Sequence, residues 1–143
     1  MSVEAGTSSR LERDGLVLDV PAVAGSVSLV RHALRAALER WGTPEPRIAD
    51  VVLASSEACS NAVVHAYRDR DAGRLQASLE LAGEITVVIR DWGVGMTPHP
   101  ERGGLGLGLV VIEALADDVD VRTPAGGGVE VVMVFTPAAA EPV

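Results

Sequence analysis

In the middle of the chain, polar residues interrupt an apolar run at regular spacing: Ser56-Glu57-Ala58-Cys59-Ser60-Asn61-Ala62-Val63-Val64-His65-Ala66-Tyr67. Glu57, Asn61 and His65 are spaced four residues apart, so on an α-helix they lie on one face as a polar stripe. Most of the flanking residues are apolar, and a helix that is apolar on nearly every side is usually buried. A buried carboxylate or carboxamide needs a partner. This stretch alone leaves two interpretations open: a binding site, or a polar stripe that meets water or a neighbouring arginine.

Two glycine-rich clusters follow further along the chain, Asp91-Trp92-Gly93-Val94-Gly95 and Gly103-Gly104-Leu105-Gly106-Leu107-Gly108. A carboxylate at the end of a strand can accept a hydrogen bond from an exocyclic amino group, and the glycines after it let a flat base lie against the main chain. Glycines at a helix start let backbone N–H groups face phosphate oxygens. Each cluster alone also fits a β-turn or a closely packed helix start. In this order, behind an acid and an amide on a helix, the clusters favour a nucleotide site.

The composition restricts the class of protein. The chain of 143 residues has the size of one domain, and 48% hydrophobic with 22% charged residues is typical of a globular protein. The sequence shows no 18-residue apolar run and no signal peptide, so we expect a cytoplasmic protein without a membrane segment. A net charge of −8 argues against direct nucleic-acid binding. Cys59 is the only cysteine, which excludes a disulfide within the chain.

All 12 cationic residues are arginine. A P-loop requires a lysine on the phosphates, and so does an ordinary protein kinase. The absence of lysine excludes both. Any phosphate chemistry must therefore rely on backbone N–H groups, a metal ion and arginine. Glu57 is a candidate general base, and Asn61 offers a neutral oxygen for Mg²⁺, which otherwise takes phosphate oxygens and water.

Hydrophobic periodicity predicts strands at residues 16–20, 75–81, 85–90, 119–123 and 129–135, and helices at 27–41, 46–67 and 105–116. Hairpin pairs that alternate with helices predict an α+β fold, a two-layer sandwich with helices on one face of a mostly antiparallel sheet. We expect a flexible leader at residues 1–14, one domain at 15–136 and a loose tail at 137–143.

The three clusters together resemble the ATP-binding fold shared by gyrase, the heat-shock chaperone ATPases, sensor histidine kinases and the mismatch-repair ATPases. Glu57-x-x-x-Asn61 resembles the N-box of that superfamily, Asp91-x-Gly93-x-Gly95 its first glycine box, and Gly104-x-Gly106-x-Gly108 its second. Within the superfamily the chain is most similar to the anti-sigma-factor serine kinases. The similar segments are residues 57–67, 101–107 and 114–119. The resemblance implies the histidine-kinase-like ATPase fold, with ATP and Mg²⁺ as cofactors.

The resemblance also implies a role for each matching residue. Glu57 would be the general base, Asn61 the Mg²⁺ ligand and Asp91 the reader of adenine. His65 would approach the phosphates or merely end its helix. The remaining nucleotide contacts would come from the first glycine box and from the backbone that cradles the phosphates, namely Gly93, Gly95, Met96, Arg102, Gly103, Gly104, Leu105 and Gly106.

The partners implied by the resemblance are an anti-sigma antagonist as phosphorylation substrate and a sigma factor, with a homodimer as one possible state. One departure favours a different function. The family usually shows Gly-x-Gly-Thr before its last strand, whereas this chain has Gly126-Gly127-Gly128-Val129 without a hydroxyl. The alternative is a nucleotide-gated binding protein without useful kinase activity. A fragment of a sensor histidine kinase is a third and less favoured interpretation.

Overall fold

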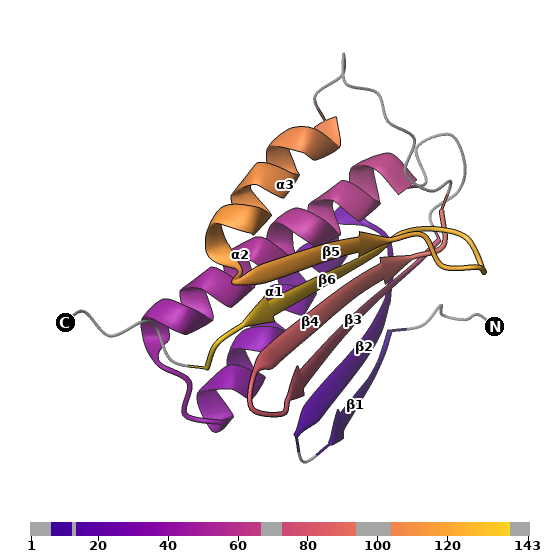
Figure 1. Ribbon diagram of the computed structural model, residues 1–143. Helices are drawn as coiled ribbons and strands as arrows, with labels where there is room; N and C mark the ends of the chain where they lie inside the picture. The colour runs from indigo at the N-terminus through magenta and orange to yellow at the C-terminus, as the bar shows by residue number, and fades with distance from the viewer. Residues whose placement is uncertain (1–6, 13, 67–72, 94–103, 138–143) are drawn as a thin grey trace.

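The computed structural model describes residues 7–12, 14–66, 73–93 and 104–137. A six-stranded sheet has the order β1-β2-β3-β4-β6-β5, and every neighbouring pair is antiparallel. The strands are β1 (Ser8–Glu12), β2 (Gly15–Pro21), β3 (Arg74–Leu81), β4 (Ile85–Asp91), β5 (Asp118–Arg122) and β6 (Glu130–Phe135). The helices are α1 (Ala24–Arg40), α2 (Glu45–Asn61) and α3 (Gly104–Leu115), and a π-helical turn, η1 (Ala62–Ala66), follows α2 directly. All helices lie on one face of the sheet (Figure 1), which confirms the predicted α+β sandwich.

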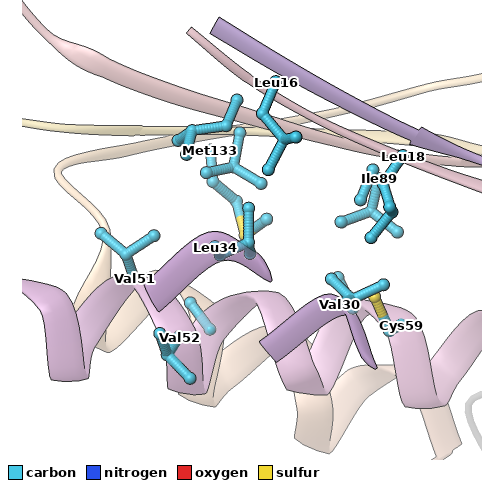
Figure 2. Close-up of a cluster of buried hydrophobic side chains, with 14 of the residues drawn as sticks. Leu16, Leu18, Val30, Leu34, Val51, Val52, Cys59, Ile89 and Met133 are labelled. Atoms are coloured by element: carbon cyan, nitrogen blue, oxygen red, sulfur yellow. The ribbon is translucent and has the colours of Figure 1, made fainter. Parts of the chain in front are cut away.

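The strands alternate between a buried and an open face. Ile85, Val87 and Ile89 of β4 are buried, and the residues between them are half-buried. Because side chains alternate along a strand, this pattern gives the sheet one apolar face toward the helices. Figure 2 shows where the two layers meet, with these buried residues labelled: Leu16, Leu18, Val30, Leu34, Val51, Val52, Cys59, Ile89 and Met133. Each such side chain contributes about 1.5–3 kcal/mol when it leaves water.

The second helix ends differently from the prediction. A continuous helix over residues 46–67 was expected, but α-helical hydrogen bonding stops at Asn61 and the next five residues form the π-turn. Tyr67 lies outside the described residues. In a π-turn each hydrogen bond spans five residues instead of four. The position of His65 around the helix axis therefore departs from the α-helical spacing that relates Glu57 to Asn61. Such turns are frequent at functional sites.

The N-terminal strand corrects a second expectation. Residues 1–14 were expected to be a flexible leader, but β1 pairs with β2 from Ser8↔Asp19 to Glu12↔Gly15. The described residues Ser8, Ser9 and Arg10 are exposed, as expected of an edge strand. Leu11 is the only apolar residue in the sequence of β1, which therefore lacks the apolar alternation that marks the central strands. The extent of the domain, 15–136, and of the tail stays a prediction.

Arg47 ties α2 to the far end of the sheet. Its guanidinium is almost completely buried and donates to the carboxylates of Asp50 and Asp117 and to the carbonyl of Thr136. The backbone N–H of Thr136 and the nearby guanidinium lower the pKa of Asp117. These contacts join the start of α2 to the segment between α3 and β5 and to the end of β6. They fix the helices against the sheet at the end opposite to the clusters.

Candidate functional site

The three clusters come together at one end of the molecule. The end of α2, the start of α3 and the end of β4 lie on the same side in Figure 1. The contacts agree, since α2 packs against α3 and β4, and η1 packs against β4. The topology therefore brings the acid and amide of α2, the aspartate of β4 and the glycine-rich start of α3 to a common place.

Asp91 is the last residue of β4 and is only 5% exposed. Its Oδ1 accepts hydrogen bonds from the backbone N–H groups of Gly93 (2.9 Å) and Val129 (3.3 Å). Its own N–H donates to the carbonyl of Val129 (3.0 Å). Burial raises the pKa of the carboxyl, and the two N–H donors oppose that rise. The main chain on both sides of Asp91 thus fixes one carboxylate oxygen.

Gly128 makes this arrangement possible. It has a φ of +81°, and a Cβ built on it would lie 2.0 Å from the carbonyl oxygen of Asp91. The loop before β6 therefore crosses directly over the end of β4, closer than any side chain permits. The pairing of Arg90 with Glu130 in the β4–β6 ladder places Val129 beside Asp91, and the close approach at Gly128 leaves the N–H of Val129 within hydrogen-bond distance of the carboxylate. The absence of a hydroxyl at Val129 is evident from the sequence. The backbone N–H of the same residue, which donates to Asp91, could not be predicted from it.

Arg90 and Trp92 brace the same crossing from the open face of the sheet. Arg90 donates from Nη2 to the carbonyl of Gly127 (3.2 Å). The Trp92 ring lies 4.6 Å from the guanidinium carbon of Arg90 and 4.2 Å from that of Arg74. Cation–π contacts of this kind contribute about 0.5–1 kcal/mol each at exposed positions. Arg90 thereby connects the loop before β6, at Gly127, to Trp92, the residue after Asp91.

The helix α2 carries the other two polar residues. Glu57 and Asn61 are half-buried, while Ala58 and Cys59 are buried against the core. Leu53, one turn before Glu57, is 49% exposed, so α2 has an open side and the polar stripe lies beside it. Burial raises the pKa of the Cys59 thiol to about 12. Cys59 is therefore an inert core residue and not a nucleophile.

Asn61 contacts α3 through Gly108. A Cβ built on Gly108 would lie 2.7 Å from Nδ2 of Asn61 and 3.1 Å from Oδ1. Gly108 is the fifth residue of α3, whose first residue is Gly104. The first N–H groups of a helix have no intrahelical acceptor and bear partial positive charge, which favours anions. The carboxamide of Asn61 thus lies about one turn along α3 from the N–H groups that favour an anion.

The structure describes only some of the predicted site residues. Gly95, Met96, Arg102 and Gly103 lie outside the described residues, and so does most of the predicted phosphate cradle. The backbone of His65 belongs to η1, and the backbones of Gly104, Leu105 and Gly106 form the first turn of α3. The structure brings Glu57, Asn61, Asp91 and Gly93 to the same end of the molecule. Their roles stay predictions.

No metal cluster of the usual protein kind is present among the described residues. No three of their His, Cys, Asp or Glu side chains are grouped to hold an ion. None of the helices in the described part of the chain is both long and apolar enough to cross a membrane.

Comparison with known proteins identifies the family. Residues 20–135 match the family model of the histidine kinase-like ATPase domain. A serine-protein kinase RsbW from Staphylococcus aureus (strain MRSA252) is 33% identical over 132 residues, 80% of this chain and 83% of that protein. An anti-sigma F factor from Clostridium novyi (strain NT) is 30% identical over 118 residues, 74% of this chain and 82% of that protein.

Solved structures agree with this assignment. The crystal structure of the RsbU and RsbW domains of a Mycobacterium tuberculosis protein superimposes on 93% of this chain with a TM-score of 0.69 and 25% identity. The match spans 36% of that longer chain. The histidine kinase domain of a blue-light activated kinase from Erythrobacter litoralis shares the fold, with a TM-score of 0.57 and 22% identity over 82% of this chain and 62% of that chain. The chain therefore belongs to the histidine kinase-like ATPase domain family and, within it, to the anti-sigma-factor serine-protein kinases, and it is a serine/threonine-protein kinase by family.

Proposed function

We propose that this protein binds ATP with Mg²⁺ where α2, α3 and β4 meet and transfers the γ-phosphoryl group to a serine of an anti-sigma antagonist. In the absence of that antagonist it holds a sigma factor and keeps it from transcription. The names of the relatives, anti-sigma F factor and serine-protein kinase, support both halves of this proposal. This chain covers more than four fifths of their length, so the likeness is not limited to a small motif.

The observation that carries the proposal is the anchored carboxylate of Asp91. Oδ1 receives the N–H groups of Gly93 and Val129, while no N–H of the described residues is bonded to Oδ2. A buried acceptor of this kind suits the exocyclic amino group of adenine. The backbone N–H of Val129 also compensates in part for the missing hydroxyl, because it orients the carboxylate of Asp91 without a side chain.

The residues present fit a magnesium ion that arrives with the nucleotide. Mg²⁺ prefers oxygen ligands and usually takes few of them from the protein, because phosphate and water supply the rest. Asn61 offers one neutral oxygen beside the start of α3, and Glu57 lies one turn earlier on the same helix. Bound Mg²⁺ would neutralise the charge on the phosphate oxygens.

Glu57 is the proposed general base. It would accept the proton of the substrate serine as that oxygen bonds to the γ-phosphorus, and the bond from the γ-phosphorus to the β–γ bridging oxygen would break to release ADP. Orphan N–H groups at the start of α3, near Gly104 and Gly106, would hold the phosphates during transfer. With no lysine in the chain, these groups and arginine take the place of the usual phosphate-binding lysine.

The experiment that tests the proposal is incubation with labelled ATP, Mg²⁺ and a candidate antagonist domain, followed by mapping of phosphoserine. Label on one serine that disappears with Glu57→Gln supports the kinase. Tight ATP binding without label on any antagonist, together with ATP-dependent capture of a sigma factor, would favour the alternative of a nucleotide-gated binding protein. The valine in place of the family's threonine is the observation that keeps this alternative open.

The proposed setting is the cytoplasm, where sigma factors act. A net charge of −8 makes direct binding to nucleic acid unfavourable, so the control over transcription would pass through the sigma factor. A homodimer stays a prediction. Sedimentation equilibrium across a range of concentrations tests it.

A further inference from the structure

Gly108 contacts Asn61 in an unusual way. A Cβ built on Gly108 would lie 2.7 Å from Nδ2, 3.1 Å from Oδ1 and 3.3 Å from Cγ of Asn61. All three are heavy atoms of the carboxamide group, and Cγ is the farthest of them, so the methyl group of an alanine would meet the outer edge of the group between Nδ2 and Oδ1. Gly108 is buried and is the fifth residue of α3.

The identity of these atoms separates two reasons for a glycine in a helix. A glycine that only permits two helices to pack closely would bring the backbone of the neighbouring helix nearest. Here the three nearest atoms all belong to one side chain, that of Asn61. Carbon and nitrogen atoms prefer separations of about 3.5 Å or more, so a methyl group at position 108 would displace the carboxamide by nearly 1 Å. The space above Gly108 is therefore space for Asn61.

We propose that Gly108 is a positioning residue: its missing side chain lets the Asn61 carboxamide lie against α3, beside the helix start that receives the phosphates. The consequence for Mg²⁺ rests on the proposed function, in which Asn61 is the metal ligand. The contact itself does not depend on that function and can be tested without nucleotide.

The first test is a nuclear magnetic resonance measurement on the nucleotide-free protein. Asn61 is the only asparagine in the chain and Gln76 the only glutamine, so their side-chain NH₂ groups give just two carboxamide pairs in a ¹⁵N correlation spectrum. Gly108→Ala should shift the Asn61 pair and leave the Gln76 pair in place, because Gln76 lies on β3 and donates to Asp19. Gly25→Ala in α1, where a Cβ meets nothing within 4 Å, is the matched control and should shift neither. An unmoved Asn61 pair in folded Gly108→Ala overturns the proposal.

The second test uses stability and stays informative if Gly108→Ala folds poorly. Alanine favours a helix over glycine, so the substitution should stabilise α3 once the clash is removed. On an Asn61→Ala background, Gly108→Ala should therefore raise the urea midpoint, whereas in the wild-type background it should lower it. Such a change of sign is the mark of a direct interaction between the two side chains. The same shift on both backgrounds overturns the proposal.

The third test connects the contact to the metal. ATP affinity is measured by calorimetry with Mg²⁺ and with a chelator, for the wild type, Gly108→Ala and Gly25→Ala. Gly108→Ala should lose about ten-fold or more of the Mg²⁺-dependent gain in affinity, the scale seen when a group that orients a metal ligand is changed, and should keep its affinity in chelator. A full Mg²⁺ gain in Gly108→Ala overturns the functional role. No Mg²⁺ gain in the wild type would instead refute the metal assignment of Asn61, and the first two tests would still decide the contact.

Discussion

Replacing Gly128 with alanine should destabilise the protein far more than the same change at its neighbour. The new Cβ would lie 2.0 Å from the carbonyl oxygen of Asp91 and 2.7 Å from Cα of Trp92, and both are backbone atoms that a rotamer change cannot move. The loop before β6 must therefore lift from the end of β4. The lift would break the two hydrogen bonds between Asp91 and Val129, one to a backbone carbonyl and one to the carboxylate.

The size of the effect follows from these contacts. A neutral hydrogen bond contributes about 0.5–1.5 kcal/mol and one to a charged group about 1.5–3 kcal/mol. Alanine at positive φ costs a further ~1–2 kcal/mol, offset in part by ~0.4–1 kcal/mol from the stiffer unfolded chain. We expect Gly128→Ala to lose about 3–4 kcal/mol of unfolding free energy, measured by urea denaturation. ATP affinity should fall as well, because the orientation of Asp91 is lost.

Gly127→Ala is the matched control for this prediction. Gly127 also has a positive φ, +92°, but a Cβ on it meets nothing within 4 Å. Its replacement should cost only the backbone strain, about 1 kcal/mol after the offset. The difference between the two variants isolates the crossing over Asp91. Equal losses in the two variants would mean that backbone strain alone determines the loss and that the close approach of Gly128 to Asp91 contributes nothing.

Three further predictions address catalysis, base recognition and the stability of the fold. Glu57→Gln should keep nucleotide binding but slow phosphotransfer by ~10²-fold or more, the usual scale of a general base, in a single-turnover assay; wild-type turnover would make Glu57 a structural residue. Val129→Thr, which restores the family's hydroxyl, should tighten ATP binding about five-fold, the effect of one hydrogen bond, in calorimetry; unchanged affinity would show that the backbone N–H suffices. Arg47→Ala should lower the unfolding free energy by about 2–3 kcal/mol because it removes the guanidinium that donates to Asp50, to Asp117 and to the carbonyl of Thr136, although both carboxylates are partly exposed to water and Asp117 keeps the N–H of Thr136. A loss below 0.5 kcal/mol in urea denaturation would contradict that role.

The central strands and the three helices were predictable from the sequence because each buries one face against the core and leaves the other face open. The alternation in β3 and β4 and the apolar spacing in α1 follow directly from packing against a single core, and the observed bounds differ from the predicted ones by three residues at most for those elements. The strand β1 was missed for the opposite reason, since an exposed edge strand has no apolar periodicity.

The finer features of the site depend on backbone events that leave little trace in sequence. The π-turn after Asn61 is a shift in hydrogen-bond register within an apolar run, and no residue type demands it. The crossing at Gly128 was hidden in a glycine run that an ordinary loop also explains. Gly108 was recognised as part of a glycine box, but its contact with Asn61 depends on how α3 packs on α2, which no local pattern encodes.

The unfolding free energy of Asp91→Asn should depend on pH differently from that of the wild type. Burial raises the pKa of Asp91, so the folded state binds its proton more tightly than the unfolded state does. The contribution of this group to stability is therefore greatest at low pH and falls as the pH rises through the interval between the unfolded and the folded pKa. Asparagine removes the charge, and its Oδ1 can still accept both N–H groups. Asp91→Asn should be at least as stable as the wild type at pH 7 and lose this advantage as the pH falls.

Calorimetric titration of ATP and Mg²⁺ into the wild type and Asp91→Asn determines whether this end of the fold binds a nucleotide and whether Asp91 contacts its base. The wild type should show one binding site, and the folded variant should bind with affinity lower by roughly 10- to 100-fold, the effect of losing a hydrogen bond to a charged acceptor. Equal affinity in the two proteins, or no binding to the wild type, would contradict this assignment of the site.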